Sequence, residues 1–315
     1  MIATQQIKST TSKIKDYKDY EKINVLKWNN SKYKTLCPYY LKTDGKEEYV
    51  NKGGVIFENF YQGAKMYDKV YENKVYPSKY YINNPSYLWW DFTPLNENAV
   101  DGDVIVDDNG DINYDNYFNW RDSLWNCSNP IRYPNKIHRR KNTKFSIVID
   151  KKNKRHKLNY LQARKRIYVK EYIRLVKKLP EYTALLSKLK AEQNLLICEV
   201  DVPTKNKSGE YGKDCDDDNN CELSIEKLEI LLNDTSEAFG HGLALAYSLL
   251  LDVKEYKKEK EKEKEKEKEK EKEKERKNNK NEENEENEEN EELINEISNV
   301  EKKEKKRKKR NNIIT

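Results

Sequence analysis

Apolar residues recur at helical spacing in the second half of the chain. From Asn159 onward they fall three or four positions apart, which places them on one face and predicts a helix. The residues on this face are Leu161, Tyr168, Tyr172, Ile173, Val176 and Leu179. Pro180 predicts the start of a further helix that runs to Leu189, because proline is favoured at a first helical position.

Two more helices are expected before residue 252. Ser224 is suited to cap the first of them, whose apolar positions are Leu228, Leu231 and Leu232. Asp234 and Glu237 have the spacing of a capping box, although aspartate makes it a weak match. The last folded helix is expected to follow the segment FGHG, residues 239–242, and to end near Asp252.

Shorter apolar runs predict strands. Residues 195–200 have the composition of a buried strand and residues 36–41 that of a short strand. Residues 145–149, with Leu158, are expected to form a hairpin. The fold class that follows is α+β: a single, mostly helical domain with a small β-sheet.

Composition divides the chain into three parts. Residues 1–25 are polar and are expected to be flexible, residues 26–252 form the domain, and residues 253–315 are a low-complexity charged tail. Of the 62 basic and 56 acidic residues, 22 and 21 lie in the tail, which leaves 40 and 35 before it. The domain itself is therefore only mildly basic.

The tail contains a Lys-Glu repeat, Asn-Glu-Glu units and a basic block at residues 302–310. Strict alternation places like charges at i,i+4 and opposite charges at i,i+3, so pairing gives a helix mixed support. We expect a solvated tail that is disordered, partly helical or in part a coiled coil. The basic block is suited to bind nucleic acid or an import receptor.

The cysteines and the amino terminus bear on location. Five scattered cysteines without a CxxC pair predict reduced thiols, no zinc site and an intracellular protein. Residues 1–13 lack the apolar core of a signal peptide, and no run approaches the length of a membrane span. We therefore expect a cytoplasmic or nuclear protein without a membrane partner. The acidic segments lack complete calcium-loop ligands, so neither metal nor cofactor is expected.

The segment FENFYQGAKM, residues 57–66, is the main candidate for chemistry. In a helix continuing to Tyr71, Glu58, Gln62 and Lys65 would share one face and Phe60 would lie on the other. Glutamate can act as a general acid or base, and a lysine near aromatic rings can lose its proton and attack a carbonyl-like carbon. The alternative is a solvent-facing stripe of polar side chains.

This segment resembles the "EHYFQAQKF" block of the NADAR superfamily, whose members act on ADP-ribose derivatives and cleave N-glycosidic bonds. Residues 38–45 resemble the preceding "SPF.L.G" strand, residues 185–199 the "LL.TG...L.E" segment, and residues 240–244 the "GKN.LG" helix. The family's "D..WG" block has no clear counterpart, and His241 stands where asparagine is usual. The resemblance covers about half of residues 30–252.

The resemblance implies catalytic roles. Lys65 would correspond to the lysine that forms a Schiff base with the opened ribose, and Glu58 to an acid/base residue. Asp201 is a candidate second carboxylate, or else a charged residue that ends a buried strand.

Substrate binding is predicted at three further places. Gln62 lies between the two catalytic groups. Gly240, His241 and Gly242 precede a helix whose amide groups are suited to a phosphate, although tight packing also explains the glycines. Trp89 and Trp90 are suited to stack on a base, although packing in the core is an alternative role for them.

Two function classes follow. The first is a hydrolase of an N-glycosidic bond in an ADP-ribose-like or ribosyl-phosphate nucleotide derivative. The second is a catalytically inactive module with the same fold that binds a nucleotide-like small molecule or nucleic acid. A third possibility is a scaffold that works through its tail.

Overall fold

The computed structural model divides into two compact units, Met1–Lys254 and Glu255–Thr315, which we describe separately. The described residues are 1–7, 17, 19–26, 32–49, 53–66, 109, 111–126, 130, 145–204, 215–218 and 220–311.

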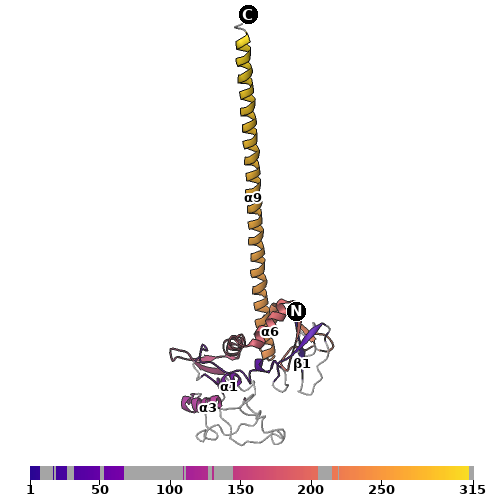
Figure 1. Ribbon diagram of the computed structural model, residues 1–315. Coiled ribbons are helices and arrows are strands. Elements are labelled where there is room, and N and C mark those ends of the chain that lie inside the picture. Colours follow the sequence, from indigo (N-terminus) through magenta and orange to yellow (C-terminus); the bar gives the residue numbers. More distant parts are fainter. Residues whose placement is uncertain are drawn as a thin grey trace. The chain divides into compact units, whose positions relative to one another are not determined.

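The larger sheet of the first unit has four strands in the order β2-β6-β1-β7, of which β1 is labelled in Figure 1. These are β1 (Ile2–Gln6), β2 (Tyr20–Asn24), β6 (Asn194–Glu199) and β7 (Asn220–Leu223). Strand β6 is parallel to both of its neighbours, whereas β7 is antiparallel to β1. The prediction of a flexible segment at residues 1–25 was wrong at β1 and β2, and the predicted buried strand at 195–200 is confirmed as β6.

Apolar residues cover both faces of this sheet. Ile2 and Ile197 belong to the main core, while the adjacent Ala3, Leu196 and Cys198 belong to a second cluster with Ile7 and Leu26. Alternation along a strand sends neighbouring side chains to opposite faces, so the sheet is buried on both sides.

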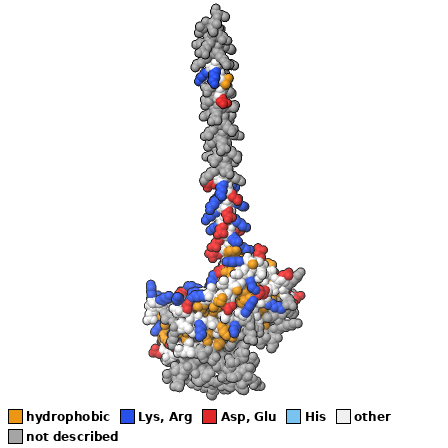
Figure 2. All heavy atoms as spheres, in the orientation of Figure 1, with side chains coloured by type: hydrophobic (Ala, Val, Ile, Leu, Met, Phe, Trp, Pro, Cys, Tyr) orange, Lys and Arg blue, Asp and Glu red, His pale blue; other side chains and the backbone are white. Residues whose placement is uncertain are grey.

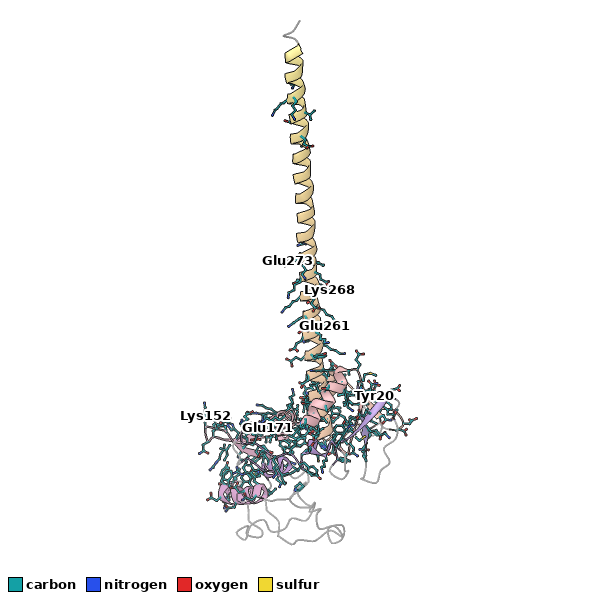
Figure 3. The ribbon with its side chains drawn as sticks, viewed as in Figure 1. Tyr20, Lys152, Glu171, Glu261, Lys268 and Glu273 are labelled. Carbon is teal, nitrogen blue, oxygen red and sulfur yellow. A yellow bond between two sulfur atoms is a disulfide. The ribbon has the colours of Figure 1, made fainter. Side chains whose placement is uncertain are left out.

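The smaller sheet has the order β3-β4-β5. It consists of β3 (Lys65–Met66), β4 (Phe145–Ile149) and β5 (Arg155–Leu158), paired antiparallel. The predicted hairpin is thus confirmed, and Lys152 lies exposed in its turn (Figure 3).

Nine helical segments complete the described chain. They are η1 (Lys34–Leu36), α1 (Phe57–Gly63), α3 (Tyr114–Asn126), α4 (Tyr160–Ala163), the π-helix η3 (Arg164–Val169), α5 (Lys170–Val176), α6 (Pro180–Lys190), α8 (Ile225–Asn233) and α9 (His241–Asn311). The mixed α and β content with small sheets agrees with the predicted α+β class.

Local signals set most helix starts as expected. Asn159 and Gln162 form a capping box before α4, Pro180 is the first residue of α6, and the Ser224 side chain accepts from the amide of Lys227. The predicted capping box at Asp234 was wrong. Asp234 is the C-cap of α8, and its side chain accepts from Ser236 within the turn that follows.

Helix α1 ends at Gly63 instead of continuing to Tyr71. The buried Tyr117 hydroxyl lies 3.0 Å from the carbonyl oxygens of both Gly63 and Ala64, which satisfies acceptors at the helix end. The chain then enters β3, where Lys65 is paired with Ser146 of β4.

Cys215 and Cys221 form a disulfide, while Cys37 and Cys198 are reduced and buried. The prediction that every cysteine is reduced was therefore wrong for this pair. Cys215 and Cys221 are six positions apart and do not form a CxxC motif, so the sequence pattern did not indicate the disulfide.

In the second unit, α9 is helical up to Asn311, including the basic block. Charged side chains alternate along its described part (Figure 2), and Glu261, Lys268 and Glu273 are labelled there (Figure 3). Among the described helices, none has a stretch long and apolar enough to cross a membrane.

Arg164 fixes the turn that leads into α9. Its side chain is buried and donates to the carbonyl oxygens of Leu231, Leu232, Asp234 and Glu237. These groups lie at the end of α8 and in the turn after it. One guanidinium therefore satisfies the backbone of the connection that positions His241.

Replacing Arg164 with methionine should lower the free energy of unfolding by about 3 kcal/mol, because it leaves several buried carbonyl groups without a donor. Urea unfolding measures the change. The matched control is Arg166→Met: the Arg166 side chain is 46% exposed and pairs with Glu48 at the surface, so about 0.5 kcal/mol is expected. Equal losses in the two variants would contradict this role for Arg164.

Candidate functional site

The polar groups of the candidate site come from four elements. Glu58 and Gln62 lie on α1, Lys65 on β3, Glu199 at the end of β6 and His241 at the start of α9. All five are buried. The expectation that Lys65 lies on the same helix as Glu58 was wrong, because α1 ends two residues before it.

Glu58, Gln62 and Lys65 nevertheless form one hydrogen-bonded chain. The Gln62 Nε2 atom donates to Glu58 Oε1 at 2.6 Å, and Lys65 Nζ donates to Gln62 Oε1 at 2.8 Å. Their exposed fractions are 7% for Glu58, 4% for Gln62 and 7% for Lys65. The alternative of a solvent-facing stripe is therefore wrong.

Aromatic side chains lie near the Lys65 amine of this hydrogen-bonded series. Lys65 Nζ lies 4.6 Å from the ring centre of Tyr61, and the Tyr61 and Tyr168 ring centres are 4.8 Å apart. Tyr168 also packs on Phe57. Burial raises the pKa of the Tyr168 hydroxyl well above its ordinary value, and the charges of Glu58 and Glu199 raise it further. This hydroxyl is therefore a neutral donor.

Glu199 is held at the start of α9. Its Oε2 atom accepts from the Gly242 amide at 2.9 Å and lies 2.6 Å from His241 Nδ1, while Oε1 accepts from the Val200 amide at 2.9 Å. The other ring nitrogen of His241, Nε2, lies 3.1 Å from the Val25 carbonyl oxygen. Both carboxylate oxygens of Glu199 and both ring nitrogens of His241 thus have a polar partner.

The pair shifts the titration of both members. Burial alone would lower the pKa of His241, but the charge and hydrogen bond of Glu199 raise it above its ordinary value. Burial alone would raise the pKa of Glu199, but His241 and two backbone amides lower it. Both directions indicate an ion pair of imidazolium and carboxylate.

Asp201 lies beside Gly240, as Glu199 does: a methyl group on Gly240 would lie 3.4 Å from the Glu199 Cδ atom. A methyl group on Gly240 would lie 3.0 Å from the Asp201 carbonyl oxygen, and Asp201 lines a cavity of about 90 Å³ with Gln6, Glu237 and Leu243 among others. Glu199 is the carboxylate that contacts His241. Sequence reasoning missed Glu199 as a site residue, although it ends the buried strand two positions earlier.

The glycines serve close packing. A methyl group on Gly242 would lie 3.0 Å from Glu199 Cβ and 3.1 Å from Ile197 Cγ2. Because the Gly242 amide already donates to Glu199, the anion at this helix start is the chain's own carboxylate. A substrate phosphate would have to bind elsewhere or displace it.

Trp89 and Trp90 lie outside the described residues. Among the described tryptophans, Trp125 packs on Phe60 with ring centres 5.6 Å apart, and the Arg121 guanidinium lies 4.2 Å from the centre of the Trp125 ring. Within the described part of the chain, no cluster of His, Cys, Asp or Glu has the arrangement of a metal site.

Comparison of the chain with protein-family models, with curated proteins and with solved structures gives no match in any of the three.

The ion pair predicts how stability depends on pH. The pKa of His241 is raised on folding, so its contribution is full below about pH 6.5 and is lost as the pH rises through the folded-state pKa. The pKa of Glu199 is lowered, so its contribution is present above about pH 4.5 and is lost as the pH falls through its folded-state pKa. Urea unfolding across this range should show greatest stability between the two limits.

His241→Asn should remove the alkaline decline and lower the free energy of unfolding by about 3 kcal/mol near pH 6, because it leaves a buried carboxylate without its cation. The control is His156→Asn, whose 2.8 Å pair with Asp150 is partly exposed, with side chains 29% and 26% accessible. An alkaline decline that persists in His241→Asn would show that another group causes it.

Proposed function

We propose that this protein hydrolyses an N-glycosidic bond in an ADP-ribose-like or ribosyl-phosphate nucleotide derivative, as a divergent member of the NADAR superfamily. The observation that supports this is the buried chain from Lys65 through Gln62 to Glu58. Burying an amine and a carboxylate that are joined by one amide is costly for folding, and such costly polar groups are typical of functional sites.

Lys65 is the nucleophile of the proposed reaction. Its neutral amine attacks C1′ of the ribose, and the bond from C1′ to the base nitrogen breaks. The Glu58 carboxylate accepts one proton from the attacking amine and transfers it to the departing base. Ring opening moves the remaining N–H proton to the ring oxygen and gives an imine between Lys65 and the sugar. Water then hydrolyses this imine to release the sugar aldehyde and restore the amine.

The surroundings favour each step. Burial disfavours the charged ammonium form of an amine, and Lys65 is buried. Gln62 holds the amine and the carboxylate in a fixed relation, which lowers the entropic cost of reaching the reactive geometry. The half-buried Tyr168 supplies a neutral hydroxyl that is suited to donate to a sugar oxygen.

The second candidate is a catalytically inactive module that binds a nucleotide-like molecule or nucleic acid. The observation that favours it is that Glu199 occupies the Gly242 amide that was expected to receive a phosphate. The basic block at 302–310, where Lys302, Lys303 and Lys305 are exposed, remains a proposed contact for nucleic acid or an import receptor.

Reductive trapping with ADP-ribose tests the proposed nucleophile. The free anomeric centre of ADP-ribose opens to an aldehyde, so a borohydride reagent should fix the imine of the last step as a stable amine. Peptide mass spectrometry should find this adduct at Lys65 at ADP-ribose concentrations that leave the exposed Lys152 unmodified. Glu58→Gln should slow labelling of Lys65 by about 100-fold, because it removes the acid/base group, and should leave Lys152 unchanged.

Calorimetry on the same samples separates the two candidates. Binding of ADP-ribose without an adduct at Lys65 would favour the inactive module. Equal labelling of Lys65 and Lys152 would remove Lys65 from the mechanism.

A further inference from the structure

The turn and second strand of the hairpin formed by β4 and β5 concentrate positive charge. Residues 151–157, which we call the basic hairpin, contain five basic side chains, and all are exposed: Lys151, Lys152, Lys154, Arg155 and Lys157. The domain as a whole is only mildly basic. Lys152 projects outward from the turn (Figure 3), and Lys and Arg side chains gather at the same edge of the first unit (Figure 2).

Ion pairs within the protein do not neutralise these charges. Among the residues that the structure describes, none of the five side chains pairs with a carboxylate. The carboxylate of the hairpin itself is Asp150, whose Oδ1 atom accepts from the amides of Lys152 and Lys154 at 2.9 Å. Its Oδ2 atom lies 2.8 Å from His156 Nε2. Asp150 therefore stabilises the turn, and the five cations are accessible to an anion outside the chain.

Aromatic rings lie beside the two basic residues of β5. Arg155 Cζ is 4.2 Å from the ring centre of Tyr114 and 5.3 Å from that of Phe118, and Lys157 Nζ is 4.9 Å from the ring centre of Phe145. The Tyr114 and Phe118 rings stack with centres 6.0 Å apart and planes 29° apart. All three rings are partly buried against the core. Packing thus holds them in place while part of each ring is accessible.

We infer that the basic hairpin, together with Tyr114, Phe118 and Phe145, binds single-stranded nucleic acid. Several exposed cations on one short hairpin suit a backbone of regularly spaced phosphates. Aromatic rings and a guanidinium plane stack on unpaired bases, whereas the bases of a duplex already stack on each other. The surface contains none of the polar groups of the candidate site, so the inference is independent of the proposed hydrolysis.

An anionic membrane is the other surface that attracts a cluster of cations. Segments that lie in a membrane interface expose large apolar residues beside their charges. The turn of the basic hairpin instead consists of Lys151, Lys152, Asn153 and Lys154, all exposed. The absence of an apolar residue from this turn favours nucleic acid.

Fluorescence anisotropy of the full chain tests the choice of partner. The probes are labelled oligouridine and oligothymidine of about 16 nucleotides and a mixed-sequence DNA duplex of the same length. Either single strand should bind about 10-fold more tightly than the duplex, and the tighter of the two identifies the preferred sugar. Equal or tighter binding of the duplex would overturn the inference. So would binding to phosphatidylserine vesicles that the single strands do not displace.

A charge variant tests the phosphate contacts. Replacing Lys151, Lys152 and Lys154 together with alanine should weaken single-strand binding about 50-fold near 0.15 M salt. It should also reduce the slope of log affinity against log salt by about two, because each phosphate contact contributes about 0.7. The matched control replaces three exposed lysines of the basic block at 302–310 with alanine: Lys302, Lys303 and Lys305. A loss in the hairpin variant no greater than that in this control would overturn the inference.

Arg155→Lys tests the stacking surface, because lysine keeps the charge and loses the planar guanidinium. Single-strand binding should weaken about 10-fold with an unchanged salt slope. The control is Arg166→Lys, at an exposed arginine that pairs with Glu48, and it should leave binding unchanged. Wild-type affinity in Arg155→Lys would contradict the stacking role and the preference for single strands. Failure of reductive trapping at Lys65 would refute the proposed hydrolysis and leave these binding results as they are.

Discussion

The Glu199 carboxylate at the start of α9 is the contact on which the arrangement of the site depends. It ends β6, which lies between two parallel strands, and it accepts from the Gly242 amide and pairs with His241. The sheet and the helix are thereby fixed to each other through one buried anion. A carboxylate suits this place because the helix start carries partial positive charge and because His241 supplies a full one.

The contact between Glu199 and His241 carries a desolvation cost, and the rest of the site carries a similar cost. Removing a carboxylate and an imidazole from water is costly, and a buried pair is rarely the most stabilising choice for a core. The chain from Lys65 to Glu58 repeats the pattern with an amide between the charged groups. Two such sets in one core place polar groups at the expense of stability, which is typical of active and binding sites.

What the sequence predicts here is mostly local. The hairpin, the Asn159 cap and the Pro180 helix start depend on residues within a few positions, and each could be predicted. Strand β1 could not, because its polar ThrGlnGln segment becomes a strand only through partners about 190 residues away, such as Leu195. The role of Glu199 could not be predicted for a similar reason, because it follows from the close approach of Gly242, 43 residues later in the chain.

The end of α1 shows why long-range contacts matter for the site itself. A helix that continued would carry Lys65 along the axis, away from Glu58, at about 1.5 Å for each residue. Tyr117 from α3 satisfies the last carbonyl groups of the helix, and pairing with β4 then turns the chain into β3. Lys65 consequently meets Gln62 from a strand, so the geometry of the amine is set by a distant tyrosine and a distant strand. The residue types of the site are visible in FENFYQGAKM, but their relation in space is a property of the whole domain.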